Sequence, residues 1–321
     1  TKVPPYTLPN PLVMQDGSSV DTAQAWESRR RPEVLRLFEE HVYGRTPSKR
    51  VDVVFEEASR DDVALGGRAT RREVTAYFTQ DRSGPQMSIL IYEPNDVPGP
   101  APAFLGLNFF GNHTVTHDPG VAINPGWMRG VAEMGVVDNL ATEASRGKAA
   151  SRWAIETILD RGYALATIYC GDLDPDYHDG FENGVHPLFS EPRQTERGED
   201  EWGTIGAWAW GLSRALDFFE QDDGIDATRV AVMGHSRLGK TSLWAGAQDE
   251  RFSLVISNDS GAGGAALARR RFGETVADSN SMCPHWFCGA YRRYANAEDD
   301  LPVDQHMLIA LMAPRPVYVA S

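Results

Sequence analysis

The sequence predicts an α/β fold, with a mostly parallel central sheet and helices on both faces. Short apolar runs, of the kind that is buried on both faces of a sheet, recur at residues 103–108, 163–169, 229–233, 252–257 and 316–320. Helix-like patterns alternate with them at residues 152–160, 204–219 and 238–248. Strand–helix alternation is typical of parallel sheets, because parallel strands need crossover connections.

The first hundred residues are expected to extend this core within a single domain of residues 1–321. Residues 22–43 have the apolar spacing of a covering helix among charged residues. Strand-like runs follow at residues 51–56, 72–78 and 87–92 and predict an antiparallel lead-in. A chain of 321 residues suits one α/β domain, whose core would occupy residues 101–321.

Composition argues against several classes of binding partner and cofactor. Lys and Arg number 31 against 45 Asp and Glu, a net charge of −14, which argues against nucleic-acid binding. Apolar runs fall short of the ~20 residues that span a bilayer, so no membrane partner is expected. Cys170, Cys283 and Cys288 are too few and too scattered for a disulfide framework or a four-ligand zinc site, although Cys283 and Cys288 could pair. The sequence contains no glycine-rich phosphate-binding loop, so we expect no cofactor. We also expect the protein to be a monomer.

Three long loops leave the predicted carboxyl ends of the strands, at residues 109–150, 171–203 and 258–303. Open α/β sheets place their chemistry beyond those strand ends. Loops of this length often serve as active-site lids. We therefore expect the functional site at this edge of the sheet.

The run from Val230 to Lys240 reads as an apolar strand, a tight turn and the start of a helix. In α/β-hydrolases a serine at such a turn is held above the sheet edge with its Oγ exposed. Gly234 would permit the turn and Ser236 is the candidate nucleophile, but the second glycine of G-x-S-x-G comes one residue late, at Gly239. By itself the turn fits a phosphate-binding or structural role equally well.

Arg237 and Lys240 are unusual residues for this position. Cations in the first turn of a helix oppose its dipole and usually cost stability. Departures from such local rules are expected mainly at functional sites. The alternative is that both cations pair with nearby acids at the surface.

The run Gly234-His235-Ser236-Arg237-Leu238-Gly239-Lys240 closely resembles carbohydrate esterase family 15, the glucuronoyl esterases, and most closely the bacterial branch. Further similar stretches lie at residues 106–114, 169–176, 257–264, 271–275 and 313–318. The likeness covers residues ~100 to 321, and the family's own motif carries the displaced glycine. It implies the α/β-hydrolase fold.

The resemblance implies an esterase that cleaves the bond between (4-O-methyl-)glucuronic acid of glucuronoxylan and lignin alcohols through an acyl-enzyme. Ser236 would be the nucleophile, and Arg237 would complete the oxyanion hole through its backbone N–H and its guanidinium. Lys240 would bind sugar hydroxyls and Glu274 the uronate ring. Trp286 could form part of the cleft wall, or could be a core residue.

The catalytic acid and base are expected late in the chain. Asp259 follows the strand at 252–257, where the family commonly has Glu; it could instead be a turn residue, or a later acid could complete the triad. The histidine base comes after the acid in α/β-hydrolases, so we expect it beyond Ser321. The sequence would then be a carboxyl-truncated part of a longer enzyme, lacking a final strand and helix.

The histidines present do not obviously supply the base. The side chain of His235 should point away from the nucleophile. His285 is the least implausible substitute for the catalytic base among the histidines present. His113, His117 and Asp118 have a spacing that superficially suggests a metal, but loop histidines at such spacing are mostly structural, so no metal is expected.

The carboxylates of residues 172–177 alternate as they do in a calcium loop. Tyr177, however, stands where that loop requires glycine. We expect this run to be a loop over the cleft.

Two other functions remain open. An acetyl xylan deacetylase would have less need of Lys240 and Glu274, and a carbohydrate-binding homologue would have lost its base. Because xylan and lignin are extracellular, we expect a secreted or periplasmic protein.

Overall fold

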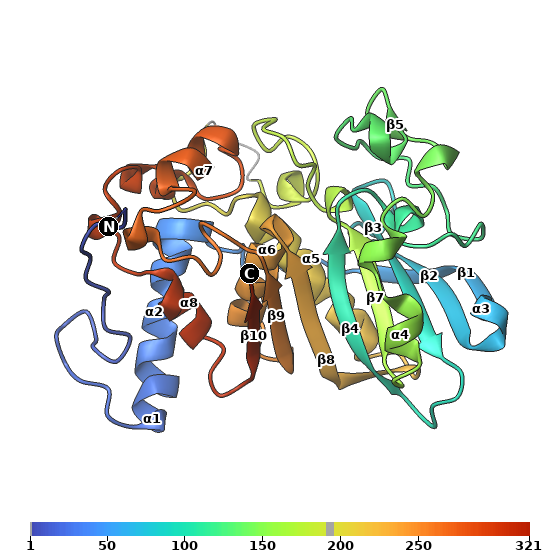
Figure 1. Ribbon diagram of the computed structural model, residues 1–321, viewed down its shortest axis with the longest axis horizontal. Coiled ribbons are helices and arrows are strands. Elements are labelled where there is room, and N and C mark those ends of the chain that lie inside the picture. Colours follow the sequence, from blue (N-terminus) through green and yellow to red (C-terminus); the bar gives the residue numbers. More distant parts are fainter. Residues whose placement is uncertain (1, 191–195) are drawn as a thin grey trace.

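A computed structural model describes residues 2–190 and 196–321 and is organised around one eight-stranded sheet (Figure 1). The strand order is β1-β2-β3-β7-β4-β8-β9-β10. The strands are β1 (Val54–Val63), β2 (Ala69–Tyr77), β3 (Gln86–Pro94), β4 (Ala101–Asn108), β7 (Ala164–Tyr169), β8 (Ile225–His235), β9 (Leu254–Asn258) and β10 (Val317–Ala320). The five strands from β7 to β10 run parallel, which confirms the predicted sheet.

The antiparallel lead-in is confirmed as well, because β1, β2 and β3 pair antiparallel and β3 joins the parallel strands through β7. The prediction for β1 ended too early, at residue 56, whereas the strand continues to Val63. This second half is polar and mostly exposed at the sheet edge. An edge strand that faces water lacks the apolar alternation on which the prediction depended.

The predicted N-terminal helix forms from residue 23 to residue 43. It consists of α1 (Ala23–Ala25) and α2 (Arg31–Phe38), each followed by a five-residue π-helical segment, Trp26–Arg30 and Glu39–Tyr43. Thr22 caps its first turn by accepting a hydrogen bond from the N–H of Ala25.

Arg31 fastens this helix to the core. Its guanidinium donates to the carbonyl oxygens of Ala247 and Leu311 at 2.8 and 3.2 Å. The N-terminal helix therefore covers the end of the sheet that carries β9 and β10 (Figure 1).

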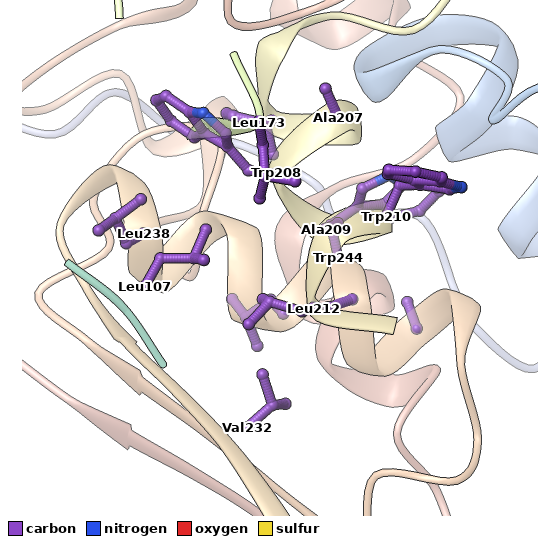
Figure 2. Packing of buried hydrophobic residues seen from close by; sticks show 14 of the residues in the cluster. Leu107, Leu173, Ala207, Trp208, Ala209, Trp210, Leu212, Val232, Leu238 and Trp244 are labelled. Carbon is purple, nitrogen blue, oxygen red and sulfur yellow. The ribbon is translucent and has the colours of Figure 1, made fainter. Parts of the chain in front are cut away.

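Two long helices, α5 (Thr204–Phe219) and α6 (Arg237–Gln248), cover one face of the sheet. Trp208 of α5 and Trp244 of α6 are fully buried there, and Figure 2 shows Leu173 beside Trp208 and Val232 below the helices. This packing fixes the start of α6 above the carboxyl end of β8.

The opposite face carries α4 (Ile155–Leu159), which packs on β7 and β3. Further short elements, besides several short 3₁₀ helices in the loops, are α3 (Ala64–Gly67), α7 (Val276–Met282), α8 (Gln305–Ala310) and the hairpin of β5 (Val136–Val137) with β6 (Leu140–Ala141). Over residues 2–190 and 196–321, no helix combines the length and the apolar character needed to cross a membrane.

The possible pairing of Cys283 with Cys288 does not occur. Both are free thiols, as is Cys170. Cys288 is buried in the apolar core, where a reduced cysteine behaves as a small hydrophobic residue.

Candidate active site

Ser236 occupies the sharp turn between β8 and α6, as the sequence predicted. Its backbone has φ 56° and ψ −128°, a conformation that costs a residue other than glycine about 1–3 kcal/mol. Its N–H donates to the carbonyl of Asn258 on β9, and its own carbonyl accepts from the N–H groups of Gly239 and Lys240. The neighbouring strand and helix thus hold the serine in a strained turn.

Two glycines allow α6 to approach the sheet this closely. A Cβ atom on Gly234 would lie 2.0 Å from the carbonyl oxygen of Leu238. A Cβ atom on Gly239 would lie 3.0 Å from the carbonyl oxygen of Asn258. The second glycine stands at 239 because that residue, rather than 238, faces the end of β9.

Arg237 is the first residue of α6, so its N–H lies in the turn that has no intrahelical acceptor. Its guanidinium carbon lies 4.5 Å from the centroid of the Phe109 ring, which follows β4. Its Nε lies 2.8 Å from Oδ2 of Asp176, which follows β7. The partner is therefore a buried carboxylate, not the surface acid that the alternative interpretation proposed.

Lys240 is a buried cation, with only 3% of its surface exposed. Its Nζ donates to the carbonyl oxygen of Ser260 at 2.7 Å and lies 5.4 Å from the centroid of the Trp286 ring. Burial lowers the pKa of this lysine, and the negative charge of Glu274 opposes that shift. Its interactions are again not those of a surface ion pair.

The structure brings the predicted sugar-binding residues together. A Cβ atom on Gly261 would be 3.5 Å from Oε2 of Glu274 and 3.8 Å from Nζ of Lys240, so both charges lie beside this glycine. Trp286 is 9% exposed and belongs to the hydrophobic core, and its ring also contacts Lys240. The roles of these three residues in binding stay predictions.

Asp259 lies next to Ser236 through the register of the sheet. His235 pairs with Asn258 across β8 and β9, and Ser236 and Asp259 are the residues that follow them. Adjacent strands are about 4.8 Å apart, and both residues have positive φ. The Asp259 side chain is exposed and its N–H donates to the carbonyl of Ala320. Its role as the triad acid remains a prediction.

The eight histidines do not include a base bonded to the nucleophile. In the part of the chain that the structure describes, no hydrogen bond joins a histidine to Ser236. His235 bonds Asn258 through Nδ1, and His285 bonds Asp176 through Nε2. The predicted base, a histidine beyond Ser321, lies outside the sequence and stays a prediction.

His113 and Asp118 have separate partners. Nε2 of His113 lies 2.8 Å from Oγ of Ser145, and Asp118 pairs with Arg71. Among the described residues, no cluster of three or more metal-ligating side chains occurs.

His113 provides a test by pH. Burial, with a smaller contribution from the charge of Arg146, lowers its pKa from 6.5 to about 4. Below pH 6.5 the unfolded chain binds a proton that the folded chain does not, so the free energy of unfolding should fall from pH 6.5 to about 4. Urea unfolding at several pH values should give a flatter dependence for His113→Gln than for the unaltered protein. Equal slopes would contradict the assignment.

The three carboxylates that resembled a calcium loop point to different parts of the molecule. Asp172 accepts from the side chain of Asn124 and from the N–H of Ser88. Asp174 accepts from Thr204 at the start of α5, whereas Asp176 faces Arg237. The run thus connects β7 to its neighbours, and the expectation that it forms a loop over the cleft stays a prediction.

Sequence reasoning missed the contacts that Phe109 and Asp176 make with Arg237. Both residues were noted only as parts of longer motifs. Their position could have identified them, because each lies just after a strand of the parallel sheet, where site residues gather.

Comparisons with known proteins agree on one family. The family model described as "Glucuronyl esterase, fungi" matches residues 197–321. Carbohydrate esterase MZ0003, from an unknown prokaryotic organism, is 52% identical over 320 residues, which are 100% of this chain and 74% of that protein.

Solved structures give the same result. A promiscuous CE15 esterase from a marine bacterial metagenome has a TM-score of 0.92 and 52% identity, with 99% of this chain and 79% of that chain covered. A glucuronoyl esterase from Solibacter usitatus has a TM-score of 0.93 and 48% identity, covering 100% of this chain and 80% of that chain.

Proposed function

Because the chain belongs to carbohydrate esterase family 15, we propose that it hydrolyses the ester between 4-O-methyl-glucuronic acid of glucuronoxylan and lignin alcohols. The observation that carries the proposal is the strained Ser236 in the turn directly before Arg237, together with the charges of Lys240 and Glu274, which both lie beside Gly261. A buried cation near a carboxylate suits the hydroxyl groups of a uronate ring.

In the proposed mechanism, Oγ of Ser236 attacks the ester carbonyl and forms an acyl-enzyme with the uronate. The N–H and guanidinium of Arg237 donate hydrogen bonds to the developing oxyanion. Such stabilisation of the oxyanion is the largest single contribution to the rate of many acyl transfers. A histidine takes the Oγ proton and passes it to the leaving alcohol, with Asp259 orienting it. Water then releases the uronate by the reverse sequence of proton transfers.

The test is hydrolysis of benzyl glucuronate by the full-length protein, with Ser236→Ala as the control. We expect turnover that the substitution abolishes. A folded, unaltered protein that does not turn over this ester, yet binds glucuronoxylan, would point instead to a non-catalytic binding protein.

A second candidate is deacetylation of xylan, because one similar esterase is described as promiscuous. Lys240→Met distinguishes the two, since it keeps the length of the side chain and removes the charge. For a uronate esterase we expect KM for benzyl glucuronate to rise about tenfold, the loss of one charged hydrogen bond, with acetyl ester hydrolysis unchanged. An unchanged KM for benzyl glucuronate in Lys240→Met would favour the deacetylase. We also propose that the protein is a secreted or periplasmic monomer.

A further inference from the structure

Asp176 is a buried carboxylate that contacts three side chains of the candidate site. It is 5% exposed and lies in the loop after β7. Its Oδ1 accepts from Nε1 of Trp286 at 2.8 Å and lies 3.1 Å from Nε2 of His285. Its Oδ2 lies 2.8 Å from Nε of Arg237. One carboxylate therefore connects the predicted oxyanion residue with the aromatic ring beside Lys240.

Asp176 carries a negative charge that complements the guanidinium of Arg237. Burial raises the pKa of its carboxyl, but the hydrogen bond from His285 and the charge of Arg237 outweigh that effect, and the pKa lies below 3.8. Arg129 approaches the same carboxylate from the exposed side, at 4.0 Å. The group is therefore ionised at neutral pH and offsets the unfavourable position of Arg237 in the first turn of α6.

Two contacts fix the guanidinium of Arg237. The ring of Phe109 covers its face, and the closest approach of Asp176 is at Nε. Those contacts restrain both the plane and one edge of the group, which leaves its terminal N–H groups to act as donors. A preorganised donor stabilises an oxyanion far better than a mobile one, because no reorganisation is needed during the reaction.

We propose that Asp176 is a positioning residue that holds the guanidinium of Arg237 for the oxyanion. The inference rests on the proposed function, in which Arg237 stabilises the transition state. Asp176 does not touch substrate; it acts through Arg237, so its removal affects kcat more than KM.

The test compares Asp176→Asn with Asp174→Asn in the full-length protein. Both changes neutralise a buried carboxylate of the same loop, but Asp174 bonds Thr204 and not Arg237. We expect Asp176→Asn to lower kcat for benzyl glucuronate by roughly 10- to 100-fold, less than the loss of a whole oxyanion donor, and to change KM less than about threefold. Asp174→Asn should keep kcat within about twofold.

A double-mutant cycle assigns the effect to Arg237. In an Arg237→Ala background, Asp176→Asn should change kcat less than about twofold, because contacting residues are coupled. The same loss in both backgrounds, or an equal loss in Asp174→Asn, would overturn the proposal.

A second readout does not depend on turnover. Nε of Arg237 is buried and lies 2.8 Å from Oδ2 of Asp176, a close ion pair without the geometry of a hydrogen bond. Its Nε–H signal in a ¹H–¹⁵N spectrum, assigned by its loss in Arg237→Lys, should exchange slowly with water because of this burial, and should exchange fast in Asp176→Asn, where the guanidinium is no longer held. Fast exchange in the unaltered protein would overturn the positioning role even if Asp176→Asn failed to fold. A protected signal in a protein inactive on glucuronate esters would refute the proposed function and leave the positioning role standing.

Discussion

Replacing Ser236 with glycine is expected to abolish ester hydrolysis and, at the same time, to stabilise the fold. The loss of the nucleophile should lower kcat by a factor of about 10⁴ or more. The gain arises because φ 56° and ψ −128° are strained for serine and unstrained for glycine. Relief of about 1–3 kcal/mol, less the ~0.5–1 kcal/mol entropic cost of glycine, should raise the free energy of unfolding by about 1 kcal/mol.

Ser236→Ala is the matched control. It removes the same hydroxyl but retains a Cβ atom in the strained turn, so its activity should be equally low without the gain in stability. Urea unfolding of the three proteins measures the difference. If the glycine and alanine variants unfold at the same urea concentration, the turn does not store strain at Ser236, and the energetic reason for its unusual backbone is wrong.

Most of the fold could be predicted because buried parallel strands are continuous apolar runs. The strands β4, β7 and β8 and the helix α5 were each located to within a few residues. The polar half of β1 was not, since an edge strand carries no such signal. The π-helical segments of the N-terminal helix also escaped prediction, because apolar spacing cannot distinguish them from α-helical turns.

The site was predicted in part, and for a different physical reason. Gly234, Ser236 and Gly239 lie in one short run, so their spacing alone describes the turn that the structure confirms. Phe109 and Asp176 contact Arg237 from the loops that follow β4 and β7. A contact between residues so distant in sequence leaves no local pattern from which it could be predicted. The positive charges at the start of α6 indicated a functional site but did not indicate which residues contact Arg237.

Gly234→Ala is expected to damage both stability and catalysis. The new Cβ atom would lie 2.0 Å from the carbonyl oxygen of Leu238 and 2.8 Å from the nitrogen of Gly239, which are backbone atoms of α6. These atoms cannot turn aside as a side chain can, so the first turn of the helix must move away from β8. Overpacking of this kind costs about 1–3 kcal/mol. A displacement of Ser236 by about 1 Å would lower kcat by roughly 10²-fold.

Gly130→Ala separates this effect from the general cost of replacing a glycine. The nearest atom to a Cβ on Gly130 is Nδ2 of Asn139, at 3.6 Å, an ordinary contact made by the end of a side chain. Stability should change by less than about 0.5 kcal/mol there, with kcat unaltered. Thermal unfolding and benzyl glucuronate hydrolysis, measured for both variants, distinguish the two effects. Should Gly234→Ala keep half of the activity and its unfolding temperature, the close approach of α6 to β8 would not be what holds Ser236 in place.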